Sequence, residues 1–428
     1  MIGAACGVGG PSAGSTARPL DKDQKDEMTW LVWSSDSGLR KQAYDEMVTR
    51  FNEQFPNVTV TRIAGGGETL EKLVTMMASD TRVDIVGTRP DYLAAYMEGP
   101  KPLQDLRSFL KKDSSVVKES DHIEGIVDAL TWKGTLHALP VGVYTNNLCL
   151  NFDLLERNGI PAPKADWTID DAMEIARRTT DRSAGDPNTA IYGFYQMWEV
   201  ITHFPYTWIR GNGGEPLTPN DDIAKSTWST DAETLNTIQW LVDLIYKAGV
   251  MPAESKGTSG YFTEGRVAIN VNETNNLYGI VTSQAEGGAQ FRWDMHPLPL
   301  MKKGRYHPIN GFSYGISRNT TNPDLTFELF KHIVGPDGQT SWYRLARFAP
   351  SIKSLLNGPY LQEKEPPSNK KPIVDGIMAA KPMPRSPRWT DINAIITENL
   401  KKVRAQEVSV REGLSDIDRR VTATIQQQ

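Results

Sequence analysis

The sequence predicts an α/β protein with two domains. Between residues 29 and 86, short apolar runs alternate with segments of helical periodicity, in the order strand, helix, strand, helix, strand. That order is typical of a doubly wound domain built on a parallel sheet. The chain of 428 residues also exceeds the length at which one hydrophobic core stops growing, which predicts a second domain.

The N-terminal elements follow from local patterns. Residues 29–33 form an aromatic, apolar run typical of a buried strand. After a polar turn, Ala43, Met47, Phe51 and Phe55 recur at every fourth position, which predicts a helix that Pro56 ends. The next elements are a strand at 58–63, a helix at 70–77 and a strand at 83–86.

The rest of the chain is richer in helices. Apolar periodicity predicts further helices at 170–179, 231–248 and 392–403, strands at 267–271 and 312–316, and a surface loop at 358–372.

Composition excludes several classes of function. The chain has 39% hydrophobic residues, a net charge of −5 and no basic block, so nucleic-acid binding is not expected. No apolar run reaches the roughly 18 residues that span a bilayer. The two cysteines and six histidines stand singly, and no nucleophile or nucleotide fingerprint occurs. We therefore expect a monomer without metal or cofactor and without catalytic activity.

The first residues predict a flexible tether at 1–26, because its first part is rich in Gly, Ser and small residues that cannot order it. Gly3-Ala4-Ala5-Cys6 resembles the end of a bacterial lipoprotein signal, which implies a lipid anchor on Cys6. An accidental cysteine in a flexible tail is the alternative. The charged and apolar segments of such a signal are missing, so we expect a truncated or misassigned start.

Several motifs occur together in one order. They are Phe51-Asn52-Glu53-Gln54-Phe55-Pro56-Asn57-Val58, Asp84-Ile85-Val86, Leu150-Asn151-Phe152-Asp153-Leu154-Leu155, Tyr261-Phe262-Thr263-Glu264-Gly265, Pro297-Leu298-Pro299, Asn310-Gly311-Phe312 and Ala349-Pro350-Ser351. From about Thr29 to the C-terminus, this series resembles the extracellular solute-binding proteins of ATP-binding-cassette importers, in the maltodextrin-binding-like group. The chain departs from that pattern where Asn310 and Arg347-Phe348 stand in place of common glycines.

The resemblance implies a two-lobed periplasmic-binding-protein-like fold. Each lobe would be a mainly parallel sheet flanked by helices, with the ligand cleft between the lobes. The expected boundaries are 27–143 with 299–335 for lobe 1, and 144–298 with 336–428 for lobe 2. The implied role is an extracytoplasmic subunit that closes around a mono- or oligosaccharide and delivers it to the permease in the membrane.

Candidate ligand-binding residues in lobe 1 follow its strands, because ligands of open α/β sheets lie beyond the carboxyl ends of strands. These candidates are Trp33, Ser34, Ser35, Thr88, Arg89 and Asp91. The resemblance places a sugar-binding carboxylate at Asp91, and a helix cap after Pro90 is the alternative. Arg89 either binds the ligand or pairs with Asp91.

The remaining candidates come from the crossover, lobe 2 and the return to lobe 1. They are Tyr144, Trp198, Trp208, Glu273, Asn275, Gly311, Phe312, Arg347 and Trp389. The resemblance puts a sugar-stacking aromatic at Trp389, and aromatic platforms with a few polar groups suit a sugar pocket. Core or hinge packing is the alternative for Tyr144 and each tryptophan. Gly311 and Phe312 are expected on a loop.

Two other functions stay open at this point. A glycoside hydrolase also lines its cleft with Trp and carboxylates, and it would need two opposed carboxylates such as Asp91 and Glu273. The same transport role with a different ligand, a glycerol-phosphate ester or a polyamine, would use Arg89 and Arg347 for a phosphate. The several aromatic residues favour a sugar.

Overall fold

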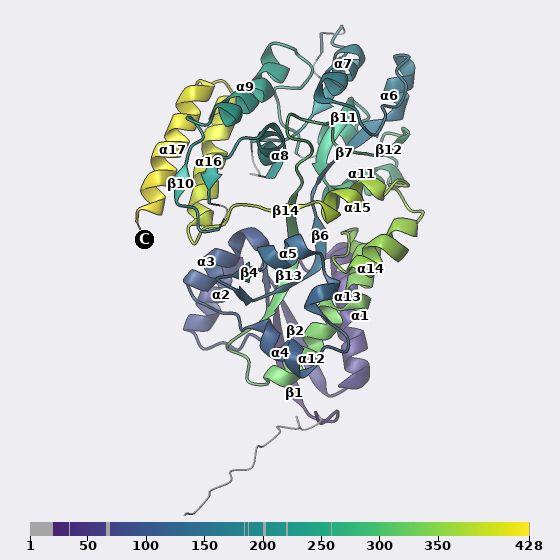
Figure 1. Ribbon diagram of the computed structural model, residues 1–428. Helices are drawn as coiled ribbons and strands as arrows, with labels where there is room; N and C mark the ends of the chain where they lie inside the picture. The colour runs from purple at the N-terminus through teal and green to yellow at the C-terminus, as the bar shows by residue number, and fades with distance from the viewer. Residues whose placement is uncertain are drawn as a thin grey trace, which may run out of the picture.

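The computed structural model describes residues 20–33, 35–65, 69–183, 185–186, 188–199, 203–219, 221–257 and 259–427. Two lobes, each a sheet with covering helices, lie one above the other in Figure 1. We call the lower one lobe 1 and the upper one lobe 2.

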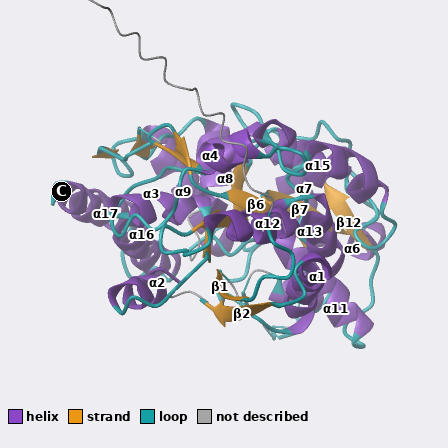
Figure 2. Cartoon of the chain, turned by 90° about the horizontal axis from the view of Figure 1, so that it is seen from below, coloured by secondary structure: helices purple, strands orange, loops and turns teal. Residues whose placement is uncertain are grey.

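Lobe 1 is built on a six-stranded sheet in the order β14-β13-β3-β1-β2, with β6 also paired to β13. The strands are β1 (Asp26–Val32), β2 (Val58–Ala64), β3 (Ile85–Thr88), β6 (Leu139–Tyr144), β13 (Pro308–Ile316) and β14 (Lys381–Pro382). β1 pairs in parallel with both β2 and β3, which is the predicted doubly wound arrangement. In Figure 2, α1 (Gly38–Gln54) and α2 (Thr69–Ala78) lie on either side of β1 and β2.

The other elements of lobe 1 are short or late in the chain. They are α3 (Leu93–Glu98), α4 (Leu106–Lys112), α5 (Glu124–Ala129), β4 (Thr131–Trp132), β5 (Thr135–Leu136), α12 (Pro323–Val334), α13 (Pro336–Ser341) and α14 (Lys353–Leu355), with single turns at Pro90–Tyr92, Glu119–Asp121, Trp342–Ala346 and Leu356–Tyr360. α13 packs on α1 and α12. The expected boundaries assign all of residues 336–428 to lobe 2, whereas α13, the turn at Trp342–Ala346 and β14 contact elements of lobe 1.

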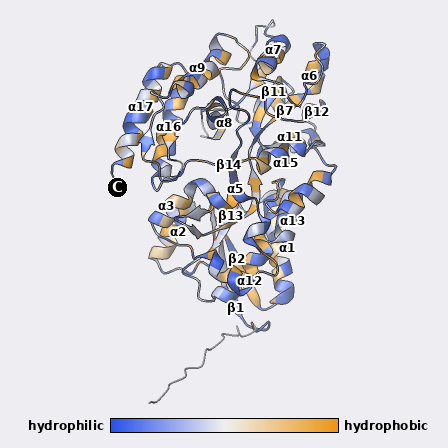
Figure 3. Cartoon of the chain, viewed as in Figure 1, coloured by the Kyte–Doolittle hydropathy of each residue, from blue (hydrophilic) through white to orange (hydrophobic). Residues whose placement is uncertain are grey.

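Lobe 2 has a four-stranded sheet in the order β12-β7-β11-β8. The strands are β7 (Asn146–Asn151), β8 (Tyr192–Tyr195), β11 (Val267–Glu273) and β12 (Trp293–His296), and β9 (Leu217–Thr218) pairs separately with β10 (Lys225–Ser226). The helices are α6 (Phe152–Arg157), α7 (Ile169–Thr179), α8 (His203–Asn212), α9 (Ala232–Tyr246), α10 (Gly260–Thr263), α11 (Leu277–Ala285), α15 (Lys371–Met378), α16 (Trp389–Arg404) and α17 (Val410–Ile425). Hydrophilic and hydrophobic residues alternate along α7, α9 and α17 (Figure 3), as expected for helices with one buried face.

The predicted α/β two-lobed fold is confirmed, but its sheets are mixed and not mainly parallel. β13 is antiparallel to β3 and β6, and β7 is antiparallel to β11 and β12. The reason lies in how the chain enters each lobe. β7 enters lobe 2 and β13 enters lobe 1 from the lobe boundary, so each runs against neighbours that end there.

Aromatic rings fill both cores. In lobe 1, the rings of Trp30 and Tyr44 lie 5.0 Å apart, and the hydroxyl of Tyr44 lies 3.0 Å from that of Tyr314. In lobe 2, the Trp208 ring lies 5.9 Å from Phe194 and 5.3 Å from Trp240. Such rings bury large apolar areas, and offset or edge-on pairs add to that stabilisation.

Two chain crossings run side by side between the lobes. β6 leaves lobe 1 at Tyr144, which pairs with Asn310 of the returning β13. Just beyond this pair, Nδ1 of His307 donates a hydrogen bond to the carbonyl of Asn146 over 3.0 Å. The carbonyl can only accept, so Nδ1 carries the proton. Burial lowers the pKa of His307 to about 4.

A second buried histidine lies in lobe 1. His122 is 1% exposed, its Nδ1 lies 2.7 Å from the hydroxyl of Ser351, and burial lowers its pKa to about 4. Both imidazoles are therefore neutral in the folded protein over the physiological pH range.

Acid should destabilise the protein through these two histidines. Each has a lower pKa in the folded state than the ordinary value of about 6.5, so unfolding takes up protons below that pH. The stabilising contribution is complete above pH 6.5 and is lost as the pH falls toward 4, by at most about 3 kcal/mol for each histidine. Denaturant titrations of the parent and of His122→Asn/His307→Asn at pH 7 and pH 4.5 measure this loss. The double variant should lose less stability between the two pH values, and an equal loss in both proteins would contradict the assignment.

Candidate functional site

A stacked ionic cluster lies on lobe 1 where β1 and β3 end. Arg89 forms a two-point ion pair with Asp91, with Nε–Oδ1 3.1 Å and Nη2–Oδ2 2.7 Å. The guanidinium carbon of Arg89 lies 5.7 Å from the ring centres of both Trp33 and Tyr92, and these rings are 5.3 Å apart. Of the two roles left open for Arg89, the structure shows the pairing with Asp91.

A carboxylate of lobe 2 also interacts electrostatically with this cluster. Burial has the largest single effect on the pKa of Arg89 and would lower it. The carboxylate of Asp91, Tyr144, Tyr92 and the carboxylate of Glu273 on lobe 2 together outweigh burial, so the pKa lies above the ordinary value. Glu273 is 5% exposed at the end of β11. Burial also raises the pKa of Tyr144, which keeps its hydroxyl protonated as a hydrogen-bond donor.

Aromatic rings form a wall beside Tyr144. The Tyr144 ring lies 6.4 Å from Phe312 and 5.9 Å from Phe348, and the guanidinium of Arg40 lies over both phenylalanine rings at 5.5 and 5.7 Å. Arg40 and Phe348 were not among the sequence candidates. The sequence gives little indication that these two residues belong to a site, because an arginine on a helix and a phenylalanine after a turn are common.

Gly311 and Phe312 lie inside β13 and not on the expected loop. A Cβ atom on Gly311 would lie 2.7 Å from the carbonyl oxygen of Gly142 in the neighbouring strand. Glycine at this position therefore permits the close approach of the two crossing strands. Arg347, where the family pattern commonly has glycine, has a φ of +64°, in the left-handed region that favours glycine.

Two of the candidate tryptophans are core residues. Trp208 is fully buried among Phe194 and Trp240, and its indole N–H donates to the side chain of Gln196. Trp198 is also fully buried, with the guanidinium of Arg404 5.9 Å from its ring centre. The packing alternative holds for both, and we leave them out of the site.

The remaining candidates differ in their position and burial. Trp389 is 2% exposed at the first position of α16. Arg347 pairs with Glu365 over 3.1 Å. Thr88 is buried at the end of β3 and Ser35 is exposed after β1, while Cys6 and Ser34 lie outside the described residues. Asn275 lies in a single turn at Thr274–Asn276, and its side chain is likewise outside the description.

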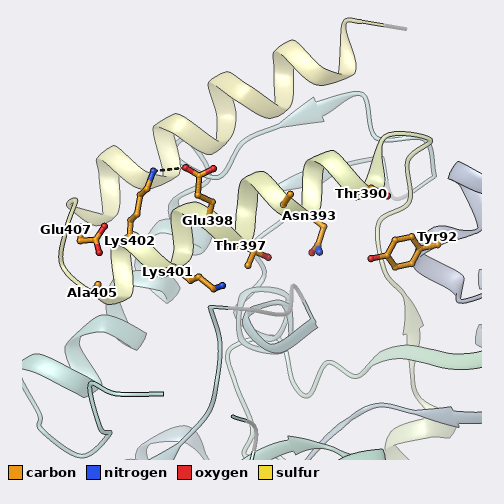
Figure 4. A pocket seen from close by; sticks show the side chains of 10 residues that line it. Tyr92, Thr390, Asn393, Thr397, Glu398, Lys401, Lys402, Ala405 and Glu407 are labelled. Atoms are coloured by element: carbon orange, nitrogen blue, oxygen red, sulfur yellow. Dashed lines mark hydrogen bonds and ion pairs between the residues drawn. The ribbon is translucent and has the colours of Figure 1, made fainter. Parts of the chain in front are cut away.

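A groove between the lobes adjoins the cluster. It is about 780 Å³ in volume and is lined by Tyr92 of lobe 1 and by one face of α16. In Figure 4, Thr390, Asn393, Thr397 and Lys401 follow one another along α16, and Tyr92 lies at the Thr390 end. The apolar periodicity of the sequence predicted only the buried face of this helix, so neither Tyr92 nor the polar face was among the predicted site residues.

The fold and the site together define a class of protein. Two α/β lobes joined by paired crossings, with an ionic and aromatic cluster on lobe 1 near the carboxylate of Glu273 on lobe 2, are the architecture of a two-lobed solute-binding protein. The family model of bacterial extracellular solute-binding proteins matches residues 46–368, and the chain belongs to this family. Membership places the chain outside the cytoplasm.

Individual proteins are similar to this chain over most of its length. The galactooligosaccharide-binding protein of Bacillus subtilis (strain 168) is 22% identical over 358 residues, covering 81% of this chain and 79% of the relative. An ABC substrate-binding protein of Listeria monocytogenes in complex with cycloalternan is similar with a TM-score of 0.80 and 19% identity, over 94% of this chain and 100% of that chain. Maltose-bound MalE3 of T. maritima has a TM-score of 0.76 and 20% identity, over 93% and 100%.

Within the part of the chain that the structure describes, no helix combines the length and apolarity needed to cross a membrane. Among the same residues, no group of three His, Cys, Asp or Glu side chains is arranged to hold a metal ion.

Replacing Trp208 should affect folding and not solute binding. Trp208→Ala would leave a large cavity in lobe 2, and substitutions of this kind cost about 3–5 kcal/mol. Denaturant titration should show that loss, and calorimetry on the folded variant should give a solute affinity within twofold of the parent. An affinity loss above tenfold in a variant that circular dichroism shows to be folded would return Trp208 to the site.

Proposed function

We propose that this chain is the substrate-binding subunit of an ATP-binding-cassette importer, and that it binds a sugar between its lobes. The observation that supports this best is the cluster of Trp33, Tyr92, Arg89 and Asp91 on lobe 1, which interacts electrostatically with Glu273 on lobe 2. The relatives named above bind oligosaccharides or maltose, which supports the same ligand class.

The chemistry of the cluster suits a sugar. A pyranose ring has apolar faces that lie on aromatic rings and hydroxyls that need hydrogen-bond partners at the edge. Trp33 and Tyr92 supply the aromatic rings. The carboxylates of Asp91 and Glu273 accept charge-assisted hydrogen bonds from the hydroxyl groups of the sugar. The ion pair holds Arg89 and Asp91 in place before the ligand arrives, which lowers the entropic cost of binding.

A phosphate ester or a polyamine fits less well. A phosphate needs uncommitted guanidinium or amide donors, and both Arg89 and Arg347 already face carboxylates. A polyamine needs uncompensated carboxylates, and Asp91 is compensated by Arg89 at 2.7 Å.

The same ion pair argues against hydrolysis. A glycoside hydrolase uses one carboxylic acid as a proton donor. Both oxygens of Asp91 accept hydrogen bonds from Arg89, so this carboxyl group is placed as a hydrogen-bond acceptor and not as a proton donor. The proposed subunit therefore binds and releases its sugar without changing it.

Closure follows from groups on both lobes touching one ligand. A ligand that contacts lobe 1 and lobe 2 only when they approach each other binds the closed form more tightly, and it shifts the population toward that form. The crossings at 144–146 and 304–308 are where the chain would bend. The closed form would present both lobes to the permease, and a lipid on Cys6 would keep the subunit near the membrane.

A sugar should compact the protein and remain intact. Thermal shift against a panel of mono- and oligosaccharides finds the binder, because a ligand at 100 times its Kd adds about 2.7 kcal/mol of stability. Small-angle scattering should then show a smaller radius of gyration with the bound sugar. Mass analysis after overnight incubation should recover the sugar unchanged, and turnover beyond one equivalent would remove the transport role.

Removing the charge of Asp91 should weaken binding. Asp91→Asn loses a charge-assisted hydrogen bond worth about 1.5–3 kcal/mol, or about 10- to 150-fold in affinity. Asp375→Asn is the matched control, since Asp375 forms an exposed pair with Lys371 on α15. Calorimetric titration should show the loss in the first variant alone. Equal affinities in both variants would show that Asp91 does not bind the sugar.

A further inference from the structure

Arg40 is a half-buried cation that lies on aromatic rings beside the crossing strand β13. It is the third residue of α1, and its guanidinium carbon lies 5.5 Å from the ring centre of Phe312 and 5.7 Å from that of Phe348. These two rings are 4.9 Å apart, and both are buried. The negative face of an aromatic ring attracts a guanidinium, so the two rings hold Arg40 in place.

No carboxylate in the described part of the chain compensates this cation. Among the described residues, the side chain of Arg40 forms neither an ion pair nor a hydrogen bond. The first turn of α1 has no acidic residue, and the acidic residues nearest in sequence, Asp36 and Asp45, both pair with Arg62. The five N–H donors of the guanidinium are therefore open to a ligand.

Tyr144 supplies a second donor beside Arg40. Its side chain is 3% exposed, and its ring lies 6.4 Å from Phe312 and 5.9 Å from Phe348, the same rings that hold Arg40. Its hydroxyl has no hydrogen-bond partner among the residues that the structure describes. A buried donor without an acceptor is costly, so this hydroxyl marks a place where an oxygen atom of a ligand would fit.

The charges around Tyr144 place the two donors in the interlobe site. Burial raises the pKa of Tyr144, and Arg89, Glu273, Asp91 and Arg40 also act on it electrostatically. Of the two cations, Arg89 already pairs with Asp91 at 2.7 Å and interacts with Glu273. Arg40 is the cation of this group that has no ion pair. Acceptors therefore lie on one side of Tyr144, and an uncompensated donor lies on the other.

These two donors match a carboxylate better than a phosphate. The planar guanidinium of arginine binds both oxygens of a carboxylate in parallel hydrogen bonds, and a tyrosine hydroxyl can donate to one of these oxygens. A phosphate ester has three oxygens and a charge of about −1.5 to −2 at pH 7, which one guanidinium does not neutralise. The nearby carboxylates of Asp91 and Glu273 would repel the excess charge.

We propose that Arg40 and Tyr144 form a carboxylate subsite within the interlobe site, and that the ligand is an acidic sugar, a uronic acid or its glycoside. The inference rests on the proposed function and narrows its ligand class, because a neutral sugar would leave the charge of Arg40 without a partner. The hydroxyls of the same sugar would donate to the carboxylates of Asp91 and Glu273. One end of the ligand is then recognised by acceptors and the other by donors.

The test compares sugars that differ only in the group on the sixth carbon. The probes are the glucose, galactose and mannose series, as monosaccharides and disaccharides, each with a hydroxymethyl group, a carboxylate or a phosphate ester on that carbon. Calorimetry gives the ratio of carboxylate to neutral affinity within each protein, so a general loss of stability cancels.

Four proteins are compared. Arg40→Gln removes the charge, and Arg40→Lys keeps the charge but loses the planar pair of donors. Arg411→Gln removes one positive charge from an exposed position of α17 in lobe 2 and is the matched control for the parent.

In the parent and in Arg411→Gln, the uronate of the binding series should bind about tenfold or more tightly than its neutral counterpart, as expected for a charge-assisted hydrogen bond. The ratio should fall to about one in Arg40→Gln and lie between these values in Arg40→Lys. A parent ratio near one, an unchanged ratio in Arg40→Gln, or tighter binding of the phosphate ester would overturn the carboxylate subsite while leaving a sugar-binding protein. Absence of binding for every probe would overturn the proposed function, and the inference with it.

Discussion

The pairing of β6 with β13 is the constraint on which the rest of the molecule depends. One strand leaves lobe 1 and the other returns to it, and every residue in both is buried. Gly311 allows this approach, since a Cβ at that position would lie 2.7 Å from the carbonyl oxygen of Gly142. Gly142 leaves room for the ring of Trp342, which would lie 2.4 Å from a Cβ there. A buried crossing must satisfy its polar groups internally, which fixes the register.

The ends of the crossing show how that requirement is met. The hydroxyl of Thr145 donates to the carbonyl of Pro308 over 2.7 Å, and the His307 imidazole donates to the carbonyl of Asn146. Because these bonds join the outgoing and the returning segment, they hold the two crossings side by side at the lobe boundary. Tyr144 and Glu273 end strands at that place, which brings them to the Arg89 cluster.

A later segment ties the lobes together a second time. Arg385, 2% exposed, donates to the carbonyls of Ala129 and Thr131 behind α5 of lobe 1, each over 2.8 Å. Its guanidinium also pairs with Asp221 in the β9–β10 turn of lobe 2. This guanidinium donates hydrogen bonds to carbonyls at the end of a short helix of lobe 1, and it forms an ion pair with a carboxylate of lobe 2. Motion between the lobes must therefore pivot near two anchored points, and α16 follows directly after the second.

Local sequence determined the elements and the family. Ala43, Met47 and Phe51 are buried on α1, because residues spaced by four lie on the same face of a helix. The apolar run at 29–33 lies in or beside β1, because a short apolar run of this kind is typical of a buried strand. The motif order from Phe51 to Pro350 led to the family whose model matches residues 46–368. In the cluster, Trp33, Arg89 and Asp91 were predictable, because strand ends of one sheet meet at one edge, whereas Tyr92 was not predicted.

Only the tertiary structure decided which tryptophans pack among other aromatic rings and which lie beside a charged group. An indole is apolar in either place, so Trp208 in the core and Trp33 beside Arg89 have the same local signature. The reversed strands β7 and β13 could not be predicted either, because their direction depends on where the chain enters each lobe. Tyr92 and Thr390 are about 300 positions apart in sequence, and their shared groove exists only because the crossings bring α16 over lobe 1. Periodicity encodes a helix face, but long-range packing determines what that face meets.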